Sequence, residues 1–196
     1  MIQVLQSGNG CIDRLSFSEP EEFIAEVAGQ SYGRAPRSIE GLIRRMILSK
    51  PPHTTPFEFV SVRMRVRAPI FVARQWMRHR TGVFMEMSGR RVDLTAIYDF
   101  SDRESVPAYF CDACHAIHSK WDGVPLEVAN RIKGTHHITT FWWRTDLHNL
   151  LHFINIRADR HAQWEIRQYA LALQTVLEER YPFTMQARSL SNDRQG

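Results

Sequence analysis

The chain has 196 residues, of which 43% are hydrophobic and 23% are charged, the balance of an ordinary globular protein. This composition excludes collagen-like and low-complexity chains, and it excludes intrinsic disorder over most of the length. The apolar runs are too short to cross a bilayer, and the N-terminus lacks the basic start and apolar stretch of a secretory signal. We therefore expect one cytoplasmic domain without membrane association.

The positive charge comes almost entirely from arginine. Lysine and arginine total 25 against 21 acidic residues, and lysine occurs only at Lys50, Lys120 and Lys133. The planar guanidinium suits bidentate recognition of phosphate and carboxylate, so the bias favours a phosphorylated partner, although arginine-rich genomic composition explains it equally well. The three cysteines, at positions 11, 111 and 114, are typical of a reducing compartment without a disulfide framework.

Hydrophobic periodicity predicts the elements of the first half of the chain. Helices are expected at Glu22–Gln30 and Ser38–Ser49, where apolar residues recur at three-and-four spacing. The clearest strand is Glu58–Ala68, in which apolar residues alternate with arginines and predict one core face and one arginine face. Pro69 is expected to end this strand and to begin a helix over Ile70–Arg78.

The second half of the chain is predicted to be mainly helical. We expect one further strand, at His137–Arg144, and helices at Ser105–Trp121, Leu126–Ile132, Leu147–Ile156 and Arg160–Glu179. Strands mixed with segregated helices indicate an α+β fold, a single domain with a β-sheet flanked by helices. The domain is expected to cover residues 1–188, followed by a polar, frayed tail over 189–196.

The densest polar cluster is Arg74-Gln75-Trp76-Met77-Arg78-His79-Arg80. Its three arginines and one histidine repel one another unless an anion neutralises them, so the cluster favours a phosphate or pyrophosphate site. A solvated basic helix end is the alternative explanation for this segment taken alone.

Seven residues separate Arg80 from Ser88, which lies in Glu86-Met87-Ser88-Gly89-Arg90-Arg91. Arg-His-Arg, seven residues and then Ser is the signature of the flavin-dependent thymidylate synthases, and the chain resembles that family elsewhere as well. The resemblance covers roughly 31–182 and includes His53-Thr54-Thr55-Pro56-Phe57-Glu58, the run Ala68–Trp76, and the segment Leu151–Ala170 with Asn155–Asp159 and His161–Ile166.

The resemblance implies a homotetramer of α+β subunits with active sites at the subunit interfaces. It implies FAD as cofactor, NADPH as reductant and methylene tetrahydrofolate as the donor of one carbon to C5 of a uracil nucleotide, dUMP or UMP. In this family the flavin hydride replaces a cysteine nucleophile, which agrees with the lack of a convincing nucleophilic cysteine here. No metal is expected.

The family's functional residues map onto individual positions of this chain. The resemblance implies flavin contacts at Ser31, His53, Thr55, Glu58, Arg78, His79, Arg80, Met85, Asp146, His148 and His152. It implies nucleotide contacts at Gln75, Arg78, Glu86, Met87, Ser88, Gly89, Arg90, Asn130, Arg131 and Arg157.

Two of these residues, Ser88 and Arg157, are expected to be catalytic. The resemblance implies that Arg157 lies against the pyrimidine and favours its N3-ionised form, which is electrostatic preorganisation. The Ser88 hydroxyl and the N–H groups of Ser88 and Gly89 suit an anionic oxygen, and Gly89 allows close approach. Without the resemblance, a salt bridge from Arg157 to Asp159 or Glu165 is the simpler expectation.

Several of the matched positions depart from the family pattern. Val83 and Met85 stand where Ser and Asn are usual, and Arg91 where Tyr is usual. The same holds for Asp146 and His148 in place of Asn and Arg, for His152 in place of Asn, and for Asn130 in place of a phosphate-clamping arginine that Arg131 can replace.

These departures predict an altered site. An aspartate at position 146 disfavours a reduced flavin anion unless it is neutral or paired with His148. We therefore expect a shifted substrate range, with UMP as a candidate beside dUMP. The sequence leaves open the sugar, a methyl or hydroxymethyl product, NADPH or NADH, and a repurposed flavoprotein without C5 methylation.

Other classes of protein also have some support in the sequence. Cys111-Asp112-Ala113-Cys114-His115 matches the haem-attachment pattern, and with His118 it offers zinc ligands on one helix face. Two buried cysteines on an amphipathic helix are the simpler interpretation. The adjacent His136 and His137 are a poor ligand pair, because neighbouring strand residues point to opposite faces.

A nucleic-acid-binding module is the remaining alternative. It rests on the pI of 9.2, on the arginines at 63, 65 and 67, and on Trp142 and Trp143. Basic charge is a non-specific indicator, so we expect no nucleic acid. The strand arginines are expected to face acidic residues across a subunit interface.

Overall fold

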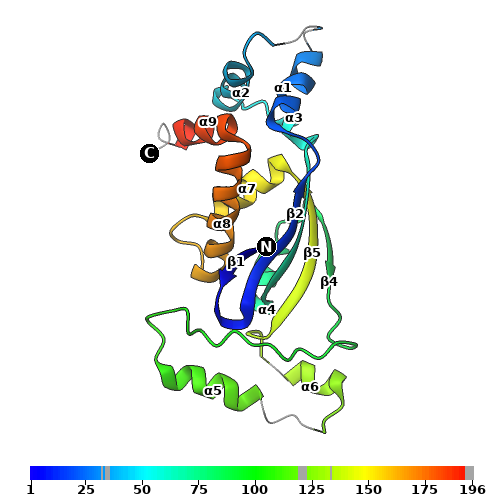
Figure 1. Cartoon of the computed structure of the whole chain (residues 1–196), viewed down its shortest axis with the longest axis vertical. Helices are drawn as coiled ribbons and strands as arrows, with labels where there is room; N and C mark the ends of the chain where they lie inside the picture. Colours follow the sequence, from blue (N-terminus) through cyan, green and yellow to red (C-terminus); the bar gives the residue numbers. More distant parts are fainter. Residues whose placement is uncertain (32, 34–35, 119–122, 133, 193–196) are drawn as a thin grey trace.

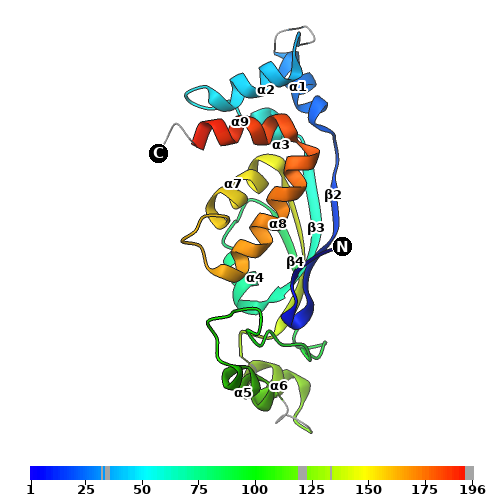
Figure 2. The same cartoon turned by 60° about the vertical axis from the view of Figure 1, so that its left-hand side comes forward.

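An antiparallel sheet of five strands runs along the molecule, and helices cover one of its faces (Figures 1 and 2). The computed structural model describes residues 1–31, 33, 36–118, 123–132 and 134–192. The strand order is β1-β2-β3-β5-β4. The strands are β1 (Ile2–Leu5), β2 (Gly10–Phe17), β3 (Ser61–Pro69), β4 (Val83–Glu86) and β5 (Ile138–Asp146).

The helices form three groups around the sheet (Figure 1). Those packed on the sheet are α4 (Ile70–Trp76), α7 (Leu147–Arg157) and α8 (Trp164–Arg180). One end carries α1 (Glu21–Gln30), α2 (Ile39–Leu48), α3 (Thr55–Glu58) and α9 (Pro182–Asn192), and the other end carries α5 (Ala108–His118) and α6 (Leu126–Ile132). The short 3-10 helix η1 (Ser7–Asn9) joins β1 to β2. No helix of the described residues is long and apolar enough to span a bilayer.

Strands β3 and β5 form the centre of the sheet and confirm the predicted alternation. Met64 pairs with Trp143 on the helix-covered face, where both are buried. Arg65 pairs with Trp142 on the opposite face, where both are exposed. A pleated strand directs successive side chains to opposite faces, so this register puts aliphatic and aromatic residues in the core and arginines outside.

The core is densest around Trp76, the last residue of α4. Its indole is fully buried and stacks on Phe153 at 4.5 Å between ring centroids. Its ring also meets Phe141, Trp143 and Tyr169 nearly edge-on at 5.6–5.7 Å, the geometry that aromatic pairs prefer. This packing fixes the point at which the chain leaves α4.

The boundaries of several elements differ from the sequence prediction. Glu58, the expected first residue of the strand, instead ends α3, and β3 begins at Ser61; Pro56 suits the first turn of this helix. Helix α4 ends at Trp76, earlier than the expected Arg78, and α8 begins at Trp164, later than the expected Arg160. β1, β2, β4 and α9 were not predicted, because each depends on partners distant in the chain.

The predicted tail is also corrected. Helix α9 continues through Asn192, so the frayed segment expected from Ser189 is wrong for 189–192. The rest of that tail, 193–196, and the expected end of the helix at 119–121 lie outside the described residues. The predicted helix at Leu126–Ile132 is confirmed with the same bounds.

Glu21 provides the start of α9 with its hydrogen-bond acceptors. Its carboxylate lies in α1, is buried, and accepts from the N–H groups of Phe183 at 3.1 Å and Thr184 at 2.7 Å. These N–H groups belong to the first turn of α9, which has no acceptors within its own helix. A carboxylate at a helix N-terminus is also favoured by the helix dipole.

Glu21→Ala is expected to lower the free energy of unfolding by about 1–2 kcal/mol, as loss of a helix cap does. Glu22→Ala is the matched control, since Glu22 occupies the same first turn of α1 but is exposed. Urea unfolding at one protein concentration measures both. Equal effects of the two substitutions would contradict the capping role.

Candidate nucleotide and cofactor site

The arginine-histidine segment follows the buried end of α4. Because the helix stops at Trp76, Arg78 lies beyond it rather than on a shared helix face with Arg74. Arg78 and Arg80 are exposed, whereas His79 turns inward against Phe153, with 4.9 Å between ring centroids. The segment therefore presents two cations outward and one imidazole inward.

Arg157, at the end of α7, is held by this segment. Its Nε donates to Nε2 of His79 at 3.0 Å, and its Nη2 donates to the carbonyl oxygen of Gln75 at 3.1 Å. The expected alternative, a salt bridge to Asp159 or Glu165, is wrong, because those carboxylates bind His161 and Arg103. Among the described residues no carboxylate forms an ion pair with Arg157.

The protonation state of His79 follows from this contact. Burial, the Arg157 charge and His152 together lower the pKa of His79 to about 4. His79 is therefore neutral near neutral pH, and Nε2 accepts from Arg157 while the proton resides on Nδ1. Burial and the Arg78 charge lower the pKa of Arg157 too, but a guanidinium remains charged.

A relay of amides orients Gln75. The carboxylate of Glu165 is buried and accepts from Nε2 of Gln163 at 3.0 Å. Oε1 of Gln163 then accepts from Nε2 of Gln75. A carboxylate accepts hydrogen bonds, so both amide orientations follow, and Oε1 is the atom of Gln75 left for a ligand. The sequence predicted no orienting role for Gln163 or Glu165, although both lie in the segment His161–Ile166 that resembles the family.

A second group of predicted residues lines a cavity of about 290 Å³ beside the turn at 88–92. Its walls include Glu86, Met87, Ser88, Gly89, Arg90, Asn130 and Arg131. The carbonyl of Ser88 accepts from the N–H groups of Arg91 and Val92, both at 3.0 Å. Within the described part of the chain, the N–H groups of Ser88 and Gly89 have no hydrogen-bond partner. Two free amides at one turn suit an anion.

Asn130 lies behind this turn. Its Nδ2 donates to the carbonyls of Gly89 at 2.7 Å and Val92 at 3.0 Å, which uses both of its hydrogens. The amide of Asn130 thus fixes the turn, and its expected contact with substrate stays a prediction. Its Oδ1 is buried and has no partner among the described residues.

Two arginines of this cavity contact Glu127, a residue for which the sequence predicted no role. Arg131 binds the Glu127 carboxylate at 2.5 Å, and Arg90 approaches it at 3.7 Å. Both arginines are largely exposed, so these pairs are weak and an incoming anion can compete for them. In the same cavity, the Glu86 carboxylate accepts from the Thr139 hydroxyl at 2.8 Å.

The residues expected to hold flavin lie in separate places. Ser31, His53 and Thr55 line a cavity of about 660 Å³ between α1, α2 and α3. His148 and His152 line a smaller one, of about 260 Å³. Exposed Glu58 lies on α3, and exposed Met85 lies on β4. One chain thus distributes part of the predicted flavin and nucleotide residues over three cavities, and the others lie outside these cavities.

Asp146 has a structural partner other than His148. It is the N-cap of α7, and its carboxylate accepts from the backbone N–H of Asn149 at 2.8 Å and from the Asn149 side chain at 2.7 Å. The start of the helix thus compensates the added negative charge.

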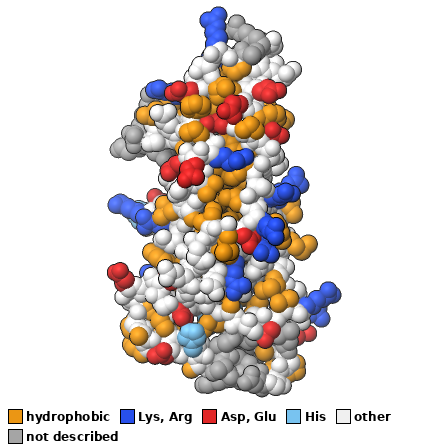
Figure 3. Space-filling model, viewed as in Figure 1, with side chains coloured by type: hydrophobic (Ala, Val, Ile, Leu, Met, Phe, Trp, Pro, Cys, Tyr) orange, Lys and Arg blue, Asp and Glu red, His pale blue; other side chains and the backbone are white. Residues whose placement is uncertain are grey.

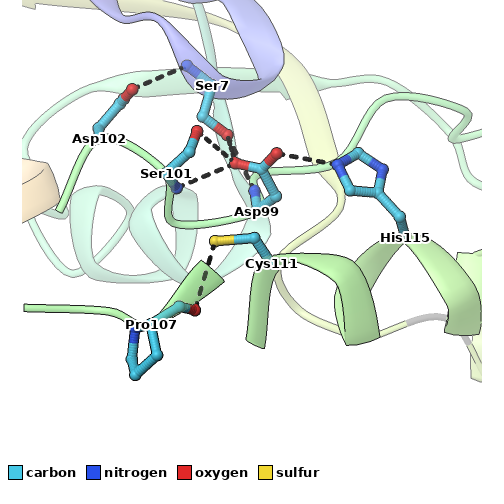
Figure 4. A network of polar contacts seen from close by, with 7 residues as sticks. All are labelled: Ser7, Asp99, Ser101, Asp102, Pro107, Cys111 and His115. Carbon is cyan, nitrogen blue, oxygen red and sulfur yellow. Dashed lines mark hydrogen bonds and ion pairs between the residues drawn. The ribbon is translucent and has the colours of Figure 1, made fainter. Parts of the chain in front are cut away.

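The residues that suggested haem or zinc are part of a structural network (Figure 4). Asp99 accepts from Ser7 at 2.5 Å and from Ser101, and it pairs with Nε2 of His115 at 2.9 Å. Burial opposes the charge of Asp99, but these contacts outweigh it and hold its pKa well below the usual range. Asp102 accepts from the N–H of Ser7, which ties η1 to this loop and to α5.

The cysteine pattern itself shows no ligand arrangement. Cys114 is buried, while Cys111 is half-buried and its Sγ lies 3.9 Å from the Pro107 carbonyl. No group of three potential metal ligands gathers among the described residues, and the side chain of His118 lies outside them. His136 and His137 belong to no such group.

The strand arginines have partners within the chain. Arg65 makes a bidentate contact with Asp13 at 2.6 and 2.8 Å, and Arg63 donates to Ser16. The expectation of an acidic partner in another subunit is therefore wrong for Arg65. These contacts also explain the arginine face without nucleic acid.

Comparisons with known proteins point to one family. Residues 14–183 match the family described as "Thymidylate synthase complementing protein". A flavin-dependent thymidylate synthase of Thermotoga neapolitana is 37% identical over 161 residues, 74% of each chain. One from Thermus thermophilus is 36% identical over 192 residues, which covers 84% of this chain and 70% of the relative. The chain belongs to the flavin-dependent thymidylate synthase family.

The fold has a solved counterpart. The UMP/dUMP methylase PolB of Streptomyces cacaoi, solved with 5-Br dUMP, superposes with a TM-score of 0.78 over 94% of this chain and 96% of PolB, at 23% identity. The comparison confirms the α+β fold. Family membership confirms the expected enzyme class, a flavin-dependent thymidylate synthase-like methyltransferase.

His79 is expected to titrate near pH 4 in the ligand-free protein, followed by NMR of its Cε1–H group and assigned by loss of that signal in His79→Gln. Because its folded pKa lies below its unfolded value of 6.5, its stabilising contribution is complete above 6.5 and declines as pH falls towards 4. Arg157→Leu should raise the midpoint. A midpoint of 6.5 or higher in the unmodified protein would refute the Arg157 contact.

Asn130→Ala is expected to loosen the turn at 88–92, because the carbonyls of Gly89 and Val92 lose a donor. Amide exchange of Arg91 and Val92 should accelerate about five- to tenfold, equivalent to roughly 1 kcal/mol. Gln3→Ala is the matched control, since the Gln3 amide also donates to two carbonyls, those of Leu5 and Gly10. Unchanged exchange at 91 and 92 in Asn130→Ala would contradict this role.

Proposed function

We propose that the chain transfers one carbon from methylene tetrahydrofolate to C5 of a uracil nucleotide, with FAD as cofactor and NADPH as reductant. The observation that carries the proposal is Arg157. This half-buried cation is held in place by His79 and the Gln75 carbonyl, and none of the described carboxylates neutralises it. A fixed cation beside an oriented amide is suited to a ring that gains negative charge.

The base is recognised by Gln75 and Arg157. Neutral uracil presents an N3–H donor between two carbonyl acceptors. The relay from Glu165 leaves Oε1 of Gln75 to accept from N3–H, and Arg157 donates towards a carbonyl oxygen. As the ring becomes nucleophilic at C5, negative charge grows on its oxygens and the arginine stabilises it. The same charge favours loss of the N3 proton.

The phosphate of the nucleotide is held at the 88–92 turn. The free N–H groups of Ser88 and Gly89 and the hydroxyl of Ser88 donate to it, and Arg90 and Arg131 leave Glu127 to add charge-assisted bonds. Glu86 and Met87 flank the sugar. Arg78 extends from the adjoining segment towards either phosphate or flavin.

The residues present fit a flavin dinucleotide. Arg78 and Arg80 are exposed cations suited to its phosphates, and the cavity beside His53 has largely apolar walls suited to a ring. When bound, FAD supplies the hydride that reduces the transferred carbon. Further contacts come from Ser31, Thr55, Glu58, His79, Met85, Asp146, His148 and His152.

The active form is a homotetramer with sites at subunit interfaces. Part of the expected flavin and nucleotide residues lie in three separate cavities of one chain, which supports a site completed by a second copy. The outer sheet face exposes Val83, Met85 and Trp142. The face of the molecule drawn in Figure 3 also carries hydrophobic side chains along its middle. Such apolar area suits a protein interface. Three free cysteines favour the reducing cytoplasm.

The substrate range includes UMP as well as dUMP. Met85, Arg91 and Asn130 stand where the family usually carries other residues, and Asn130 lines the nucleotide cavity. These departures change the charge and the polar contacts of the site, which supports a shifted substrate range. PolB, of the same fold, is a UMP/dUMP methylase.

Tritium release from C5-labelled dUMP and UMP tests this proposal in the presence of FAD, NADPH and methylene tetrahydrofolate. Release from UMP is expected, alone or with dUMP. Arg157→Leu should lower kcat about 100- to 1,000-fold, as loss of a transition-state donor does. Arg160→Leu, three residues on and exposed, is the control and should change kcat less than about twofold.

The outcomes separate the alternatives. Release from dUMP alone would remove UMP from the proposal. Release from neither nucleotide, with FAD binding verified, would instead favour a repurposed flavoprotein of the same fold.

A further inference from the structure

A small cavity between α2, α3, α7 and α9 has basic walls. Its volume is about 260 Å³, and it is lined by Ile47, Pro52, Thr54, Phe57, His148, Leu151, His152, Asn155, Arg188 and Ser191. Arg188 and two histidines face it, and no aspartate or glutamate is among its lining residues. The proposed function uses the two histidines but assigns nothing to α9, which contributes the arginine.

Arg188 is a partly buried cation without a carboxylate partner among the described residues. Its Nη2 donates to the carbonyl of Leu151 at 3.1 Å. Among the described residues no carboxylate pairs with it, and burial alone lowers its pKa. A guanidinium carries five N–H donors and remains charged in proteins. Removing such a group from water is costly unless an anion compensates it, so this arrangement favours an anionic ligand.

The size of the cavity limits what it holds. Sites for whole drug-sized ligands measure about 300–1,000 Å³, so a cavity below that range suits one charged group of a cofactor rather than the entire cofactor. Thr54, Asn155 and Ser191 add uncharged donors to its wall. A guanidinium with neutral donors matches a phosphate or a carboxylate, which it can bind bidentately.

The position of the cavity connects it to the candidate active site. The ring of His152 lies 6.1 Å from that of His79, the residue that holds Arg157. A molecule whose anionic group lies in this cavity is therefore close to the His79 region.

We propose that Arg188, with His148 and His152, forms an anion site that binds one phosphate or carboxylate of a cofactor in the active site. This inference rests on the proposed function. The test compares two cofactors of that function that carry such a group, the flavin dinucleotide with its phosphates and the folate with its glutamate carboxylates.

The test compares Arg188→Leu, Arg188→Lys and the wild type, all as the full chain. Leu removes the charge but keeps an apolar side chain of moderate size, whereas Lys restores the charge without the bidentate fork. Arg44→Leu is the control, since Arg44 is exposed on the neighbouring helix α2. Thermal unfolding and gel filtration establish that each variant folds and assembles as the wild type does.

Dissociation constants are measured by fluorescence for two pairs of ligands: FAD against riboflavin, and folate against pteroic acid, which lacks the glutamate. Arg188→Leu should weaken the anion-bearing member of one pair by about tenfold or more and leave the other member within about twofold. Loss for FAD identifies the flavin phosphate, and loss for folate identifies the glutamate. Arg188→Lys should recover part of that affinity, and Arg44→Leu should match the wild type.

Equal losses within both pairs, or no loss in either, would overturn the anion site while leaving the proposed function intact. Failure of the wild type to bind any of the four ligands would instead remove the proposed function, and the anion site with it.

Discussion

The burial of Trp76 is the contact on which the site depends. Its indole lies against four aromatic rings contributed by β5, α7 and α8, and thus joins the sheet to the helices that cover it. Truncating a buried tryptophan to alanine typically costs about 3–5 kcal/mol, a large part of the stability of a domain. Gln75 precedes this anchor and Arg78 and His79 follow it, so their placement is a consequence of core packing.

The arginines of this structure have two kinds of partner, carboxylates and neutral groups. On the outer sheet face, Arg65 has an acidic partner, Asp13, and serves the fold. Arg157 and Arg188 are partly buried but bind backbone carbonyls and a neutral imidazole rather than a carboxylate. Because a desolvated charge without a counterion costs free energy, such residues indicate where an anionic ligand compensates the charge.

Positioning in this site relies on neutral amides as much as on charge. Gln163 donates to the buried carboxylate of Glu165 and accepts from Gln75, so the carboxylate fixes the orientation of both amides. Asn130 holds a turn by donating to two of its carbonyls. Each of these amides has its orientation imposed by its partners, so the atom it leaves for a ligand is defined before the ligand arrives.

The sequence by itself determined the features that depend on neighbouring residues. The alternation along β3, the helix α6 and the cluster at 74–80 follow from local periodicity and charge, and three motifs in order identified the family. Only the tertiary structure decided that Asn130 lies behind a turn and that Arg188 reaches the cavity of His148. The partners of Asn130 and Arg188 lie more than thirty residues away along the chain, at separations of 41 and 37 residues. Local pattern carries no information about such contacts, because they are set by how the sheet and the helices pack.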